Sequence, residues 1–72
     1  NITVNKILNK ALNKIGVNDI KEKDLLIRNI SGYAYKGRGQ EIIAEAFADY
    51  YANKQNASLL SKNIIEVMKG MI

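Results

Sequence analysis

The sequence predicts an all-α fold, a small bundle of three to four short helices around one core. Apolar side chains recur at helical spacing in separate stretches of the chain. Proline is absent, so no ring geometry forces a helix to break. Five glycines mark the expected breaks between these stretches. A length of 72 residues allows one domain at most, so we predict a single helical domain over residues 1–72.

The first helix is predicted over residues 4–15. Thr3 suits its N-cap and Gly16 suits the position just past its end. One apolar stripe runs along it, formed by Val4, Ile7, Leu8, Ala11, Leu12 and Ile15.

Residues 18–30 fit either a helix or, from Leu25, a short strand. A helix to about Arg28 is favoured, capped by Asn18 or Asp19. Its buried face would consist of Ile20, Leu26, Ile27 and Ile30.

The second half predicts two more helices. Residues 31–40 are expected to form a loop, residues 41–52 a strong helix and residues 53–57 a polar connection. A last helix begins with Ser58 or Ser61 as its cap. We expect the first helix to pack against Ile43, Phe47 and Tyr50, with the last helix closing the third side.

Composition excludes several kinds of chemistry. The chain has no Cys and no His, so it offers neither a thiolate nor the commonest general base and zinc ligand. A Ser-His-Asp arrangement is likewise excluded. We therefore expect no enzymatic activity from this chain alone and no cofactor.

Positive charge is concentrated in the first part of the chain. Net charge is +4 overall, and residues 1–40 carry eight basic and three acidic side chains. Lys6, Lys10 and Lys14 stack at i,i+4 spacing, which costs a few tenths of a kcal/mol per like-charged pair. Two interpretations stay open: a solvated face, or a surface for DNA phosphates or an acidic protein.

Two further groups of side chains are candidates for binding. Tyr33 and Tyr35, with Lys36 and Arg38, could grip single-stranded nucleic acid or could cap the core. Glu41, Glu45 and Asp49 lie on one helical line. They could sit beside a metal, although the dipole at a helix N-terminus also favours Glu41 without one.

The context of the chain is also a matter of expectation. No apolar run approaches the roughly 18 residues that span a bilayer, and no signal peptide is present. The chain begins at Asn1 and stops at Ile72, so we interpret it as a fragment of a larger protein. Short helices with partly covered apolar faces make homo-oligomerisation a further possibility.

A family resemblance enters in the second half. The stretches Ile30–Ala34, Glu41–Asn53 and Ala57–Ile65 resemble the C-terminal segment of minor head (head-morphogenesis) proteins of tailed bacteriophages and prophages, over about residues 30–72. The resemblance implies a structural or interaction module that acts in virion assembly. Its implied partners are phage head or portal proteins and, non-specifically, DNA, and its implied location is the virion or the bacterial host cytoplasm.

The block Glu41–Asn53 is also similar to the tail of lethal-factor-like zincin metallopeptidases. That similarity implies Glu41 as a third zinc ligand, Glu45 as its support, and Tyr33 or Tyr35 as a transition-state stabiliser. The His-Glu-x-x-His helix of that family is absent here. A zincin fragment that lacks this helix, and a basic helical module that binds nucleic acid or protein, remain the alternatives.

Overall fold

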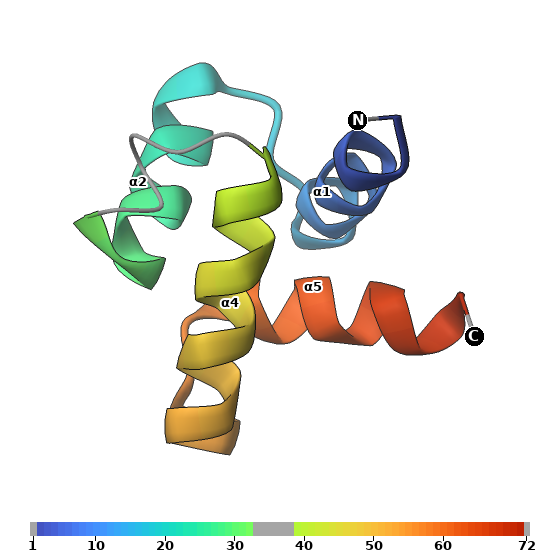
Figure 1. The fold of residues 1–72 in the computed structure, drawn as a ribbon. Helices are drawn as coiled ribbons and strands as arrows, with labels where there is room; N and C mark the ends of the chain where they lie inside the picture. Colours follow the sequence, from blue (N-terminus) through green and yellow to red (C-terminus); the bar gives the residue numbers. More distant parts are fainter. Residues whose placement is uncertain (1, 33–38, 72) are drawn as a thin grey trace.

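The computed structural model describes residues 2–32 and 39–71, and it is all-helical there. The elements are α1 (Ile2–Ile15), α2 (Ile20–Ile30), α4 (Gly39–Asn53), the 3₁₀ turn η1 (Lys54–Asn56) and α5 (Leu59–Gly70). No strand occurs within these described ranges. The predicted fold class is therefore confirmed (Figure 1).

Helix α1 ends at the predicted residue, just before Gly16, but it begins earlier than predicted. Gly16 has φ +90°, a left-handed conformation that glycine adopts without steric cost. Its N–H and that of Val17 both donate to the Leu12 carbonyl, at 3.0 and 3.1 Å, which satisfies a helix-end acceptor. Because α1 begins at Ile2, Thr3 lies in the first turn and not at the N-cap, which corrects that prediction.

Residues 20–30 form a helix, which decides between the two predicted alternatives. Asp19 is the N-cap, and its carboxylate accepts a hydrogen bond from the Lys21 N–H at 3.1 Å. Ile27 is buried in the core. Ile20 is 77% exposed, so its predicted place on the buried face is wrong. The reason is its position as the first residue of the helix, before α2 meets the rest of the bundle.

Helix α4 begins at Gly39, two residues earlier than predicted, so the expected loop does not extend to residue 40. A Cβ on Gly39 would lie 2.6 Å from Val4 Cγ1. The start of α4 therefore packs so closely on α1 that a side chain at position 39 would require Val4 to shift.

Helix α5 lies at the centre of the packing. It contacts α1, α2 and α4, and Leu60 and Ile64 on it are fully buried. Helix α1 contacts α4 as predicted. Its larger interface, however, is with α5, whereas we expected α4 to be its main partner. Figure 1 shows α1 lying above α5, and α4 running across the start of α5. The core consists of Ile7, Leu8, Ala11, Leu12, Ile27, Ile42, Ile43, Ala46, Leu60, Ile64 and Val67.

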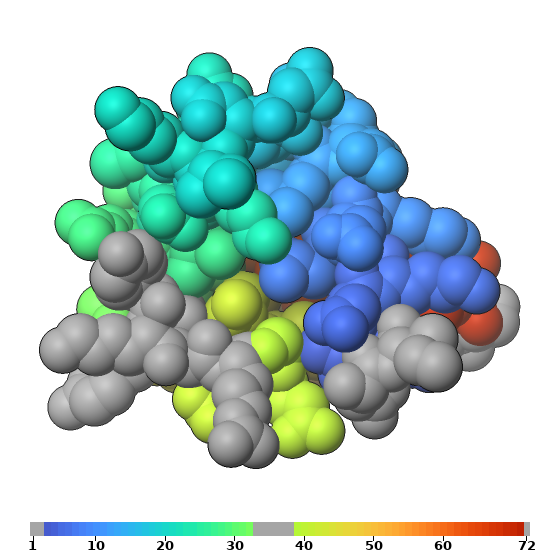
Figure 2. Space-filling model, turned by 90° about the horizontal axis from the view of Figure 1, so that it is seen from above, coloured from blue at the N-terminus to red at the C-terminus, as the bar shows by residue number. Residues whose placement is uncertain are grey.

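The opposite side of α1 and α2 faces solvent. Figure 2 looks onto the surfaces of these two helices, with part of α4 visible between them. Asn5, Lys6, Asn9, Lys10, Asn13 and Lys14 are all exposed. The Asn-Lys repeat of α1 therefore covers the outer face of the bundle, while the apolar stripe of the same helix faces the core.

Candidate functional site

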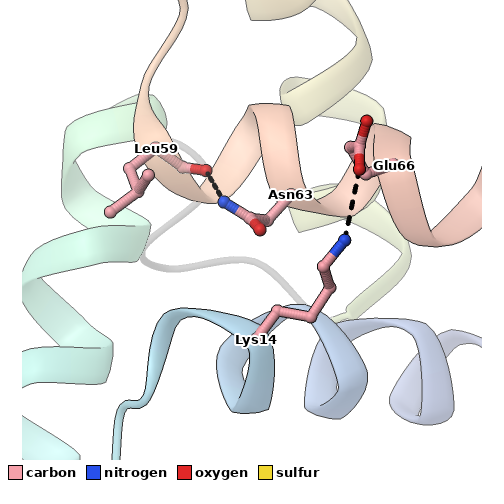
Figure 3. A network of polar contacts seen from close by, with 4 residues as sticks. All are labelled: Lys14, Leu59, Asn63 and Glu66. Carbon is pink, nitrogen blue, oxygen red and sulfur yellow. Dashed lines mark hydrogen bonds and ion pairs between the residues drawn. The ribbon is translucent and has the colours of Figure 1, made fainter.

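The lysines predicted on α1 are exposed, and one of them has a partner within the chain. Lys14 Nζ lies 3.2 Å from Glu66 Oε2 on α5, with both side chains largely exposed. Figure 3 shows this pair beside the hydrogen bond from the Asn63 amide to the Leu59 carbonyl, at 2.9 Å. Exposed pairs of this kind contribute under about 1 kcal/mol. Lys6 and Lys10 remain solvent-facing, and Lys14 is already engaged within the chain.

The second predicted group lies outside the described part of the chain. Tyr33, Tyr35, Lys36 and Arg38 all belong to the segment 33–38. Their role in binding therefore stays a prediction.

Asp49 joins the end of α4 to the start of α5. Its Oδ2 accepts hydrogen bonds from the Ser61 hydroxyl at 2.7 Å and the Ser58 N–H at 2.9 Å. Its Oδ1 accepts from the Asn53 amide at 2.7 Å. The Ser58 hydroxyl also accepts from the Ser61 N–H at 3.3 Å and so caps α5. We call Asp49, Ser58 and Ser61 the polar corner.

The polar corner shifts the acidity of Asp49. Burial by itself raises the pKa of this carboxyl, because it disfavours the charged form. The hydrogen bonds from Ser61, from the Ser58 N–H and from Asn53 stabilise that charged form and outweigh the burial. The net effect lowers the pKa from 3.8 to about 2. Asp49 is thus ionised at neutral pH. Its Oδ2 joins α4 to the start of α5, and its Oδ1 is bonded within α4 to Asn53.

The other two carboxylates of the predicted line do not join Asp49. Glu45 accepts a hydrogen bond from the Ser31 hydroxyl at 2.9 Å, which ties α4 to the C-cap of α2. Glu41 is exposed in the first turn of α4. Among the described residues, no group of three His, Cys, Asp or Glu side chains lies close enough to hold a metal ion. The spacing of these acids therefore places them on one helix without bringing them together at one site.

An apolar groove of about 400 Å³ lies where α1, α4 and α5 meet. Ile7 of α1 and Ile65 of α5 lie buried at its base. Tyr51 and Met71 also line it, and they are 67% and 46% exposed. We call this the Tyr-Met groove. Its remaining lining residues are Phe47, Tyr50, Met68 and Lys69.

Aromatic rings and lysines form one side of the Tyr-Met groove. Phe47 and Tyr51 stack with centroids 6.2 Å apart and ring planes 19° from parallel. Lys54 Nζ lies 5.0 Å from the Tyr51 centroid and 5.8 Å from that of Tyr50. Lys69 Nζ lies 5.7 Å from the Tyr50 ring. Two positive charges therefore flank an apolar surface, each held by cation–π attraction.

Lys54 adopts an unusual backbone conformation. Its φ is +52°, in the left-handed region where a residue with a Cβ pays on the order of 1–2 kcal/mol. Helices most often use glycine at such a turn. Here the residue that follows α4 keeps a long cationic side chain at some cost in backbone energy. Departures from local rules of this kind occur at functional or strained sites.

Reasoning from sequence missed the Tyr-Met groove. The helical pattern assigned Tyr50 to the face that packs against the first helix. A signal was present, because Tyr50-Tyr51 with Met68 and Met71 supplies more large apolar side chains than two short helices can bury. Tyrosine and methionine are also enriched at protein interfaces.

Comparison with known proteins identified no relative of this chain. No protein-family model, curated protein or solved structure matches this chain significantly. Within the described ranges, no helix has the length and apolar character needed to cross a membrane.

Proposed function

We propose that this chain is a non-catalytic structural and interaction module of a phage minor head protein and that it acts in virion assembly. The observation that carries the interaction role is the Tyr-Met groove, an apolar surface with Tyr51 and Met71 open to solvent. Exposed apolar patches rimmed by polar groups are typical of protein–protein contacts. The assignment to phage heads rests on the resemblance of residues 30–72.

The carboxylates support a structural rather than a catalytic role. Asp49 and Glu45 are engaged in hydrogen bonds that join α4 to its neighbours. The chain lacks His and Cys, so Glu41 has no imidazole or thiolate partner within it for a zinc site. The acidic block thus acts as a scaffold that positions the aromatic side of α4.

Purified phage heads provide the test. Particles from the encoding host strain are separated on a density gradient, and each fraction is searched for peptides of this chain by mass spectrometry. We expect the peptides to sediment with heads that contain portal protein. Their absence from all particle fractions, with portal peptides present, would contradict the assignment.

The zincin alternative makes a different prediction for the parent gene. A His-Glu-x-x-His motif upstream in the same reading frame would provide the two missing zinc ligands. Terminase, portal or capsid genes beside the frame, without that motif, would favour the head protein. Calorimetric titration with zinc separates the two ideas only for the parent, because we expect no tight site in residues 1–72.

Non-specific DNA binding is the second candidate role, favoured by the exposed positions of Lys6 and Lys10. Contacts to phosphates weaken steeply as salt rises, because each releases counterions. Duplex DNA binding at low salt that disappears in Lys6→Gln/Lys10→Gln would support it. Undetectable binding at low salt would remove DNA from the proposal.

A further inference from the structure

We propose that the Tyr-Met groove binds an acidic amphipathic helix of a partner protein. The inference rests on the proposed interaction role and names the chemistry of the partner. Three features of the groove carry it: its apolar base, its flanking charges and the backbone conformation of Lys54.

The base and sides of the groove suit large apolar side chains. Ile7 and Ile65 form the bottom, and the stacked Phe47 and Tyr51 rings form a rigid side. Met68 lies on the α5 side, where its flexible thioether can adapt to different shapes. A helix recognised in such a groove presents apolar anchors at i, i+3, i+4 and i+7.

The flanking charges select the sign of the partner. Lys54 and Lys69 both lie over the groove tyrosines, and Lys62 lies beside Lys69 in the adjoining hollow. Glu66 shares that hollow, but it is paired with Lys14. A partner with carboxylates beside its apolar anchors would therefore meet complementary charge, which raises both specificity and association rate.

The same charges disfavour a second copy of this chain as the occupant. A two-fold contact brings the same patch of both copies together, so Lys54 and Lys69 of each copy would meet. Like charges placed across an interface suppress such a pairing. The net charge of +4 acts in the same direction.

The conformation of Lys54 is an independent indication. Glycine would satisfy φ +52° without strain, yet the position holds a cation above two tyrosines. A Lys54→Gly variant should therefore fold at least as well as the parent while it loses a flanking charge. A loss of binding in this variant could therefore not be attributed to a loss of stability.

The probes are two synthetic helical peptides with a tryptophan anchor. One carries Glu on both sides of its apolar positions, and the other carries Lys at the same places. The chain has no Trp, so a blue shift of peptide emission reports burial of the anchor. We expect the acidic peptide to bind and the basic one to bind at least about tenfold more weakly, as electrostatic selection implies.

Matched variants locate the binding. Tyr51→Ala should weaken the acidic peptide by about tenfold or more, as interface tyrosines often do. Ile20→Ala removes a similarly exposed apolar side chain elsewhere and should change nothing. Lys54→Gly/Lys69→Gln should weaken binding by about three- to tenfold. Lys21→Gln/Lys23→Gln on α2 loses the same charge away from the groove and should leave binding unchanged.

Several outcomes would overturn the inference. Equal binding of both peptides, or equal weakening by both lysine pairs, would mean that no charge selection occurs at the groove. Sedimentation equilibrium that shows a dimer abolished by Tyr51→Ala would make a second copy the occupant. If peptide binding fails while the chain still sediments with heads, only this inference is lost. Peptide binding without any association with heads would instead refute the proposed function.

Discussion

The two ends of α5 differ in how fully their side chains are bonded or buried within the chain. At the first end, Ser58 and Ser61 form a closed network with Asp49, and Ser61 is fully buried. At the other end, Met71 is 46% exposed and the Tyr-Met groove opens beside it. One helix thus uses its start for folding and leaves its end available for recognition. The comparison predicts that stability and the proposed binding can be changed separately by substitutions at the two ends of α5.

The largest effect is expected from the middle of α5, which both ends share. Ile64 is fully buried, and Ile64→Ala should cost about 2–5 kcal/mol. A small domain has only about 5–15 kcal/mol in total, so both ends should be lost together. Urea unfolding followed by circular dichroism measures the change. The control is Leu59→Ala on the same helix, where the side chain is 50% exposed; similar midpoints for both variants would refute the packing described here.

An intermediate effect is expected at the closed end when the pH falls. The folded-state pKa of Asp49 is lowered from 3.8 to about 2, so its ionised form stabilises the fold. That contribution is fully present above the unfolded value and is lost as pH falls from about 4 towards 2. Because Asp49 is only partly buried, we expect about 1–2 kcal/mol. Unfolding free energies measured at several pH values test this.

Asp49→Asn isolates that contribution, because it keeps the shape of the side chain and removes its charge. The variant should be less stable than the parent at pH 7, and the difference should shrink as the pH approaches 2. An acid sensitivity that survives unchanged in the variant would place its origin in other carboxylates.

The smallest effect is expected at the open end. Tyr51 is 67% exposed, and its ring contacts the stacked Phe47 and Lys54. Tyr51→Ala should change the free energy of unfolding by less than about 1 kcal/mol, as exposed substitutions do. Thermal unfolding measures it. A loss as large as that of Ile64→Ala would mean that the groove side of α4 belongs to the core.

The helices could be predicted from the sequence because their cores depend on local spacing. The stripe from Ile7 to Ile15 and the cap at Ser58 gave boundaries within about two residues, as such signals allow. The helix at residues 20–30 was harder, since its apolar residues fit two periods. Ile20 was placed wrongly. Helical spacing shows which face of a helix a residue lies on, but it does not show whether a neighbouring helix extends far enough to cover that residue.

The sites could be predicted less well, because they depend on how helices cross. Asp49 was grouped with Glu45 and Glu41, four and eight residues before it, whereas the serines that bond it across the turn, Ser58 and Ser61, lie nine and twelve residues after it. That partnership requires the turn at Lys54, which carries no glycine to signal it. The Tyr-Met groove likewise arises where three helices, α1, α4 and α5, meet, and no local pattern in the sequence records that meeting.

The interface between α1 and α5 has a consequence for how the protein is made. Among the described helices, α1 has its most extensive contacts with α5, so in a growing chain the apolar stripe of α1 lacks its main partner until α5 has been synthesised. Closing that long loop also sets an entropic barrier that local helix formation cannot lower. We therefore expect the core to close only after α5 has been made, and partial products of translation to be exposed to proteases and chaperones until then.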